Sequence, residues 1–260
     1  YLATNQGVVG SNPASRATLP RPHPSKGPIS MDSFDLASVV RALSIYALPV
    51  LLAITLHEAA HGYAARMLGD DTAERAGRIT LNPLAHIDPV GTVLIPIAIY
   101  LATAGSFLFG YARPVPVNFS ALRSPKRDMI WVALAGPGSN VVQAFGWAIL
   151  FTLLVAFGSQ EPFFQEVAQA GILVNIIMAV FNLLPLPPVD GGRILVGLLP
   201  WRAAVAVSRI EPYGFFILLG LLFTGLLSDY WMRPLMALSY DLLRLAMSPL
   251  IGLLLPVASP

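Results

Sequence analysis

Residues 39–67 read VVRALSIYALPVLLAITLHEAAHGYAARM, an apolar run that two histidines and a glutamate interrupt near its end. The run is long enough to cross the hydrocarbon core of a bilayer, which takes about 20 residues in a helix. Positions four apart lie on the same face of a helix, so His57 and His61 can reach one metal ion, with Glu58 beside the water that such an ion binds. Ionisable side chains within a membrane segment cost about 3 kcal/mol each and mark a functional site by default.

The composition extends this picture to the whole chain. Of its 260 residues, 55% are hydrophobic and 12% are charged, against about 25% charged in an ordinary soluble domain, so a lipid bilayer must replace much of the water. Sixteen Lys and Arg stand against 14 Asp and Glu without a dense basic cluster, and nucleic acid is not an expected partner. The absence of cysteine excludes thiolate ligands and leaves carboxylates and four histidines, which are His23, His57, His61 and His86.

Apolar segments recur along the chain and predict an all-α polytopic membrane protein, a bundle of about five to six membrane segments. They lie at residues 39–67, 90–112, 129–157, 163–184, 213–227 and 235–256. The last of them contains Asp241 and Arg244 and could instead lie along the membrane interface. Residues 1–30 are rich in Ser, Pro, Gly and Asn, so we expect a disordered tail there and the functional domain at 31–260, with Met31 as a hypothetical start.

A catalytic zinc site needs a third protein ligand. Asp190 is the leading candidate because it lies near the end of the stretch NLLPLPPVDGG (182–192), where prolines break a helix and glycines allow a sharp turn. Irregular backbone at membrane depth is tolerated where it lines a cavity in the protein. Two alternatives stay open: Asp190 could simply cap a helix, and His86 in NPLAHIDPVG (82–91) is a rival ligand.

The stretch YARPVPVNF (111–119) alternates valine with proline. Proline at every second position fits an edge strand whose missing N–H groups point away from the neighbouring strand. An extended proline-rich linker explains the same pattern. We therefore expect either a small membrane-associated β element or an extended linker at this place.

The motifs HEAAH (57–61) and NLLPLPPVDGG (182–192) together resemble the site-2 protease family of intramembrane zinc metalloproteases, in its compact form without a PDZ domain. The segments NPLAHIDPVG, RPVPVN (113–118) and AGPGSN (135–140) resemble that family as well. The resemblance implies that His57, His61 and Asp190 bind Zn²⁺, that Glu58 is the catalytic base and that Asn182 helps to stabilise the oxyanion. It also implies a membrane protein substrate, cut within or beside the bilayer in regulated intramembrane proteolysis.

Other parts of this interpretation rest on the residues alone. Asn175 and Asn182 are seven positions apart on one helix face, so with Gln169 they could line a wet cavity, or they could bond neighbouring helices. A membrane transporter of metal ions or protons with a buried His/Asp site is the alternative function, because it shares the apolar segments and the intramembrane histidines. Such a transporter does not require a glutamate between two ligands. The substrate, its route of entry and the oligomeric state are not encoded in any motif.

A common metal site also constrains the topology. If segments 90–112, 129–157 and 163–184 all crossed the bilayer, Asp190 would lie about 30 Å from His61. We expect 90–112 to be re-entrant, because Pro96 and Gly105 interrupt it. The basic residues that flank the later segments then share one side with the metal site, and the positive-inside tendency predicts an active site that opens toward the cytoplasm from the cell membrane.

Overall fold

The computed structural model describes residues 36–95, 98 and 113–255, and these residues form helices and connecting loops without a strand. Within them, five helical stretches are long and apolar enough to cross a membrane, which confirms the expected all-α polytopic architecture. The five stretches are Val39–Met67, Pro125–Ala156, Pro162–Asn182, Trp201–Phe223 and Ser228–Leu254.

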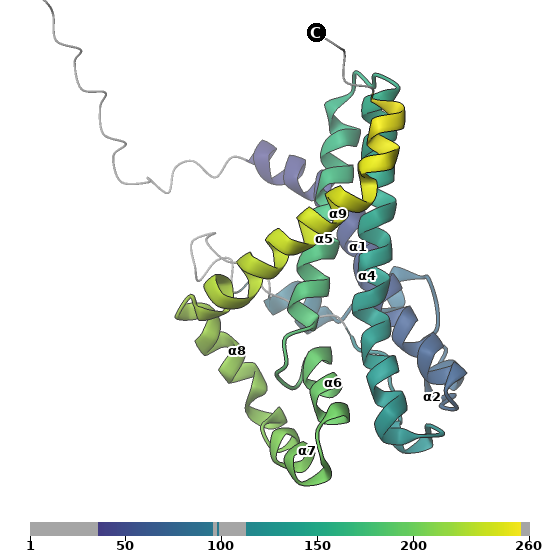
Figure 1. Cartoon of the computed structure of the whole chain (residues 1–260), viewed down its shortest axis with the longest axis vertical. Helices are drawn as coiled ribbons and strands as arrows, with labels where there is room; N and C mark the ends of the chain where they lie inside the picture. Colours follow the sequence, from purple (N-terminus) through teal and green to yellow (C-terminus); the bar gives the residue numbers. More distant parts are fainter. Residues whose placement is uncertain (1–35, 96–97, 99–112, 256–260) are drawn as a thin grey trace, which may run out of the picture.

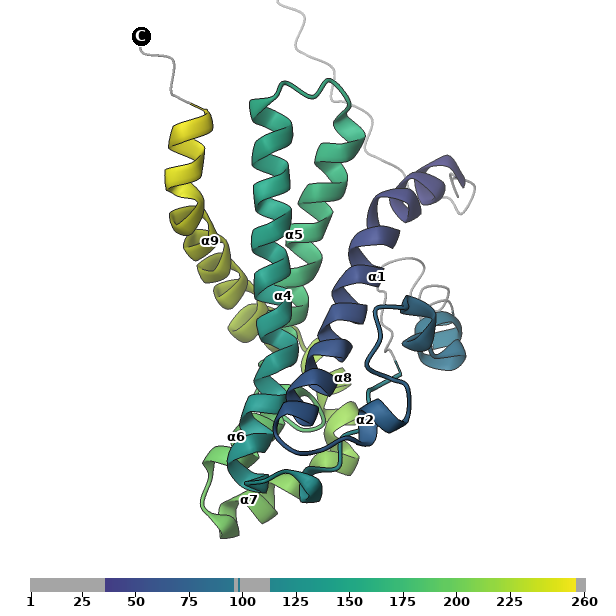
Figure 2. The same cartoon turned by 90° about the vertical axis from the view of Figure 1, so that its right-hand side faces the viewer.

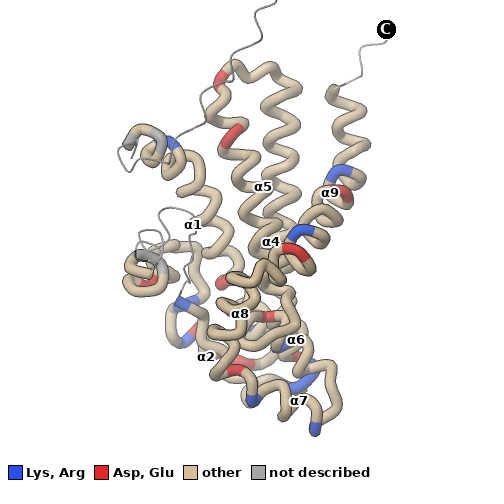
Figure 3. Tube along the Cα trace, turned by 90° about the vertical axis from the view of Figure 1, so that its left-hand side faces the viewer, with Lys and Arg blue, Asp and Glu red and all other residues tan. Residues whose placement is uncertain are grey.

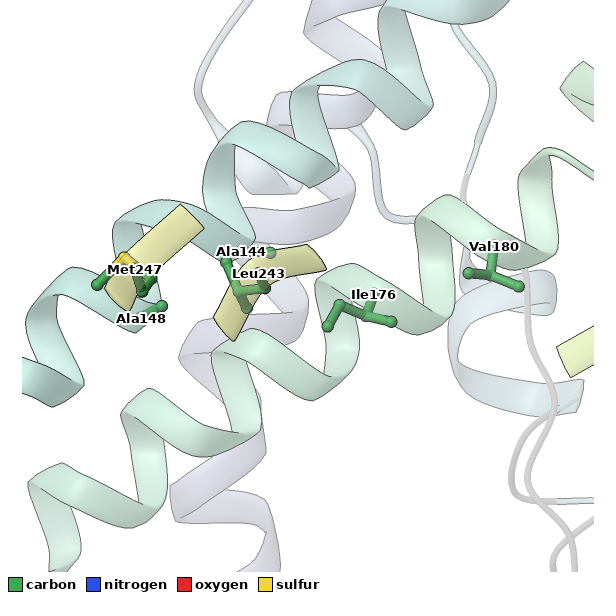
Figure 4. Packing of buried hydrophobic residues seen from close by; sticks show 6 residues of the cluster. All are labelled: Ala144, Ala148, Ile176, Val180, Leu243 and Met247. Carbon is green, nitrogen blue, oxygen red and sulfur yellow. The ribbon is translucent and has the colours of Figure 1, made fainter. Parts of the chain in front are cut away.

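Two antiparallel helices, α4 (Pro125–Ala156) and α5 (Pro162–Asn182), form the centre of the bundle (Figure 1). Each begins with proline in its first turn, where the missing N–H has no partner to lose. Helix α1 (Leu36–Met67) packs on one side of this pair and α9 (Arg233–Leu254) on the other (Figure 2). A cluster of buried side chains lies between α4, α5 and α9 (Figure 4), and its two alanines on α4 let the helices approach closely. Its members are Ala144, Ala148, Ile176, Val180, Leu243 and Met247.

Beyond α5 the chain turns back on itself. Helices α6 (Asp190–Leu198) and α7 (Trp201–Ser208) lie at the end of the bundle where α4 begins, and α8 (Gly214–Phe223) leads back to α9 (Figure 1). The apolar stretch Trp201–Phe223 is therefore not one straight helix, because the short 3₁₀ turn Glu211–Tyr213 separates α7 from α8. The predicted segment at 235–256 becomes α9, which packs on α4 and α5 rather than lying apart from them.

The ends of the helices meet the topological requirement for a shared site. The Arg123 N–H donates to the Leu68 carbonyl at 3.0 Å, so α1 ends at the same end of the bundle where α4 begins. Helix α5 runs antiparallel to α4 and ends there too. The predicted re-entrant segment 90–112 lies mostly outside the described residues, as does the tail 1–30. The described start of the segment 90–112 belongs to a short π-helix, Pro89–Leu94, whose N-terminus is capped by the Asp88 side chain.

Residues 113–118 are extended but pair with no strand among the described residues. Two of their N–H groups donate to carboxylates instead: Val115 to Glu58 and Asn118 to Asp70, each at 2.7 Å. The predicted β element is therefore not formed in the described part of 111–119, and the extended-linker interpretation describes it. Burial alone would raise the pKa of Asp70, but hydrogen bonds from Thr72 and Asn118 lower it below its ordinary value, so the carboxylate stays ionised.

Candidate metal centre

His57 and His61 lie one turn apart on α1 and point to the same place. Their Nε2 atoms are 3.1 Å apart and the rings meet edge to face, with centroids 4.7 Å apart. His57 is buried and His61 is half-buried, so neither ring is freely solvated. This arrangement follows from the spacing of four residues, which places both side chains on one face of a helix.

The other nitrogen of each ring bonds to α4. His57 Nδ1 lies 2.6 Å from the side-chain oxygen of Asn140, and His61 Nδ1 lies 2.7 Å from the backbone carbonyl oxygen of Val132. A carbonyl oxygen only accepts, so both Nδ1 atoms must donate, and each neutral ring then carries a lone pair on Nε2. This is the tautomer in which a histidine binds a metal ion.

The Asn140 amide is itself fixed in place. Its Nδ2 donates to the carbonyl oxygen of Ala53 at 3.3 Å and to the side-chain oxygen of Asn175 at 2.9 Å. Asn175 in turn donates to the carbonyl of Gly171 at 2.9 Å. Asn140 and Asn175 are both 0% exposed, so these bonds form in a region without water, where amide groups need protein partners.

Asp190 reaches the two rings from the first turn of α6. Its Oδ2 lies 3.3 Å from the Nε2 of His57 and 3.3 Å from that of His61. The loop before it folds tightly over the helix start, because a Cβ on Gly191 would lie 2.3 Å from the carbonyl oxygen of Leu183, and one on Gly192 would lie 2.2 Å from the backbone nitrogen of Pro187. The two glycines are thus required by close packing of backbone on backbone.

The three atoms fit a zinc ion. Ligands bound tetrahedrally to Zn²⁺ at about 2.0–2.1 Å lie about 3.3 Å from one another, close to the separations described above. Each of the three atoms is a lone-pair acceptor, and Asp190 Oδ2 is buried without a hydrogen-bond donor. Within the described residues no other group of three metal-binding side chains converges in this way.

The remaining predicted residues lie in different settings. Glu58 is half-buried on α1 and accepts the Val115 N–H described above. Asn182 is the last residue of α5, and its Nδ2 donates to the carbonyl of Met178 in its own helix at 3.0 Å. His86 is buried apart from the metal group, with Nε2 3.0 Å from the carbonyl oxygen of Thr80, so it is not the third ligand of this group.

Asn175 and Gln169, which could have lined one wet cavity together, have different surroundings in the structure. Asn175 bonds a neighbouring helix, so the second interpretation of its position is correct. Gln169 lines a cavity of about 380 Å³ between α1, α5 and α9, together with Tyr46, Glu166 and Tyr240. Sequence reasoning missed the part that Asn140 plays, although the residue ends the AGPGSN segment. The only available signal was an amide in the middle of an apolar segment, which is costly unless it is bonded.

Comparison with known proteins identifies the family. Residues 158–225, which include Asp190, match the model described as "Peptidase family M50". Over 197 residues the chain is 38% identical to "Putative zinc metalloprotease YwhC" of Bacillus subtilis. This match covers 74% of this chain and 85% of that protein. The chain belongs to peptidase family M50. It is also 31% identical over 183 residues to "Putative zinc metalloprotease Rip2" of Mycolicibacterium smegmatis, covering 70% of this chain and 67% of the relative. No solved structure matches it.

Membership in peptidase family M50 confirms the resemblance to the site-2 proteases that the two motifs suggested. The M50 protein is an intramembrane zinc metalloprotease, and its helices provide a group of side chains that could hold the zinc ion. The transporter alternative is set aside, because relatives of this similarity are named as zinc metalloproteases.

Replacing Gly136 with alanine is expected to weaken zinc binding about tenfold or more, the usual size of a change beside a metal ligand. A Cβ at this position of α4 would lie 2.3 Å from His61 Nε2 and 2.7 Å from His57 Cε1 and would push the rings apart. Gly138→Ala is the matched control, since a Cβ there meets nothing within 4 Å. Zinc retention against a competing chelator measures the effect, and equal retention by the two variants would contradict it.

Proposed function

We propose that this M50 protease cleaves membrane-embedded or membrane-proximal protein substrates, with His57, His61 and Asp190 as the zinc ligands and Glu58 as the catalytic base. The observation that carries the proposal is the meeting of three lone-pair atoms from two distant segments, with a glutamate between the two histidines in the chain. A zinc ion held there supplies a Lewis acid that activates water and polarises the peptide carbonyl.

Glu58 takes the proton from the attacking water in this proposal. A general base must be held within hydrogen-bond reach of the proton that it accepts. The Val115 N–H engages one carboxylate oxygen, Oε2, at 2.7 Å, and a carboxylate has a second oxygen with which to accept the proton. Glu58 then donates this proton to the nitrogen of the leaving amine when the peptide C–N bond breaks.

Asn182 helps to stabilise the oxyanion through its side-chain amide. Donors aimed at developing charge are often worth about 100-fold or more in rate. In this structure the Asn182 Nδ2 donates to Met178, so it must turn away from its own helix when the substrate is bound. A change of side-chain rotamer at the end of α5 is enough for that.

The substrate is bound as an added strand along residues 113–118. A helical substrate hides its carbonyls in its own hydrogen bonds, and an extended edge offers main-chain groups that replace them. The side chain of Val115 is buried against α1 and that of Val117 packs beside Ala65 and Leu122, so recognition uses the backbone. Within the described residues the Val117 N–H has no hydrogen-bond partner, and it is the donor that we assign to the substrate.

The active site opens toward the cytoplasm, and the protein lies in the cell membrane. Basic residues gather, with acidic residues among them, around α2 (Thr72–Arg75), α6 and α7 (Figure 3), at the end of the bundle where α4 begins, whereas the opposite end of α5 carries Glu161 and Glu166. This asymmetry favours the basic end in the cytoplasm. His57, His61 and Asp190 lie in the part of each segment nearer to that end.

Glu58→Gln is expected to abolish cleavage of a model membrane peptide while the bound zinc and the melting temperature stay unchanged, because glutamine keeps the shape but not the base. His57→Ala and Asp190→Ala, in contrast, should lose zinc as well as activity. Zinc content per mole of detergent-purified protein is measured beside turnover. Cleavage by Glu58→Gln at the wild-type rate would refute the base, and full zinc retention by both ligand variants would refute the ligand set.

Val117→Pro is expected to raise KM about tenfold, because it removes one donor of the substrate edge, whereas Val117→Ala keeps that donor and serves as the control. Bound zinc should be the same in both variants. If both variants slow cleavage equally, the side chain and not the backbone is responsible, and strand addition at this edge is wrong.

A single cysteine tests the orientation, because the natural chain has none. In intact cells Arg127→Cys should resist a membrane-impermeant maleimide until the membrane is opened, and Gln160→Cys, at the other end of α4, should react from outside. The reverse pattern would place the metal site on the external side.

A further inference from the structure

Two acidic side chains hold the extended residues 113–118 beside α1: Glu58 of that helix and Asp70 of the loop that follows it. The Glu58 and Asp70 carboxylates each accept one backbone N–H, from Val115 and Asn118. Asp70 is 0% exposed and also accepts the Thr72 N–H at 3.0 Å, so it is a rigid anchor. These contacts fix which residue of the segment faces the catalytic glutamate.

The guanidinium group of Arg78 binds carbonyl groups of the same backbone segment. Arg78 Nη2 donates to the carbonyl oxygen of Arg113 at 2.8 Å and lies 3.5 Å from that of Pro114. The closer bond is thus to the peptide group before Pro114, and the next peptide group, whose N–H donates to the Glu58 carboxylate, has its oxygen 3.5 Å from the same guanidinium.

The position of Arg78 is not explained by an ion pair. Its neighbours Arg66 and Arg75 pair with Glu74 and Asp71, but among the described residues no carboxylate lies within 4.0 Å of the Arg78 guanidinium. Burial and the nearby Arg113 lower the pKa of Arg78, and the Glu58 carboxylate opposes this shift. Ile79 follows directly and packs with Val115 on Gly62 of α1, where a Cβ would lie 3.0 Å from Ile79 and 3.3 Å from Val115.

We propose that Arg78 is a positioning residue for the catalytic base: it holds the backbone at Arg113 and Pro114 so that the N–H of the next residue, Val115, orients the Glu58 carboxylate toward the metal centre. The inference rests on the proposed role of Glu58. Glutamate has three rotatable side-chain bonds, and a base that is misplaced by about 1 Å can lose 100-fold in rate. The segment that offers an edge to the substrate thus also fixes the group that takes the proton.

Arg78→Ala is expected to lower kcat about 10- to 100-fold, the effect of one hydrogen bond to a charged group, with KM changed less than about twofold and zinc content unchanged. Arg78→Lys should recover part of the loss, because an ammonium group reaches one carbonyl but not two. Millimolar guanidinium should restore Arg78→Ala and leave Glu58→Gln inactive. Arg75→Ala, which removes an exposed ion pair of the short helix α2 just before Arg78, is the matched control and should behave as the wild type.

The backbone donor is tested separately by Val115→Pro, which removes the N–H, against Val115→Ala, which keeps it. The proline variant should show the same loss of kcat as Arg78→Ala, and the double variant Arg78→Ala, Val115→Pro should lose little more, since the two changes break one chain of bonds. This pair also decides the question if Arg78→Ala does not fold.

Three outcomes would overturn the proposal: wild-type kcat in Arg78→Ala, a loss of activity that follows zinc loss, or a rise in kcat in Val115→Pro, which would mean that the N–H restrains the base. An active Glu58→Gln would instead defeat the proposed function itself. An inactive Glu58→Gln beside a fully active Arg78→Ala would defeat only the positioning role.

Discussion

The meeting of three lone-pair atoms inside a lipid-embedded bundle is the constraint on which the rest of the structure depends. The Nε2 atoms of His57 and His61 and the Oδ2 of Asp190 lie 3.1–3.3 Å apart, and each is an acceptor because both Nδ1 atoms donate to α4. In a low dielectric such acceptors repel one another unless a cation lies among them, so an ion bound there would tie the start of α6 to the histidines of α1. Helix α4 contributes none of these three atoms, yet it fixes both histidines, through the Val132 carbonyl and the Asn140 amide.

Much of this centre could be predicted from local pattern. The spacing of His57 and His61 fixes their common helix face, and the proline-glycine break around Asp190 marks an irregular wall at membrane depth. The partner of His57 could not be predicted in this way, because Asn140 is 83 residues away and no spacing rule links the two. Long-range side-chain contacts become visible only when the helices are placed side by side.

The two inaccurate expectations have the same physical origin. The alternation of valine and proline in 113–118 shows which N–H groups are available but not what accepts them, and here the acceptors are carboxylates rather than a strand. Hydropathy likewise measures how apolar the stretch 213–227 is, but not where it bends, and α8 covers only Gly214–Phe223 of it. In both places the sequence pattern shows which N–H donors or apolar side chains are present. The residues that pack against them in the folded protein determine the structure.

The chain of amides through Asn140 and Asn175 has a consequence for the bundle as a whole. Apolar side chains in a bilayer gain little from one helix neighbour over another, so hydrophobic packing leaves helices free to slide along their axes. Ala53 on α1, Asn140 on α4 and Asn175 on α5 are linked by directional bonds at one depth. A slip of a single residue, about 1.5 Å, would break them in a dry interior. The Asn140 and Asn175 side chains therefore fix the positions of α1, α4 and α5 along their axes relative to one another.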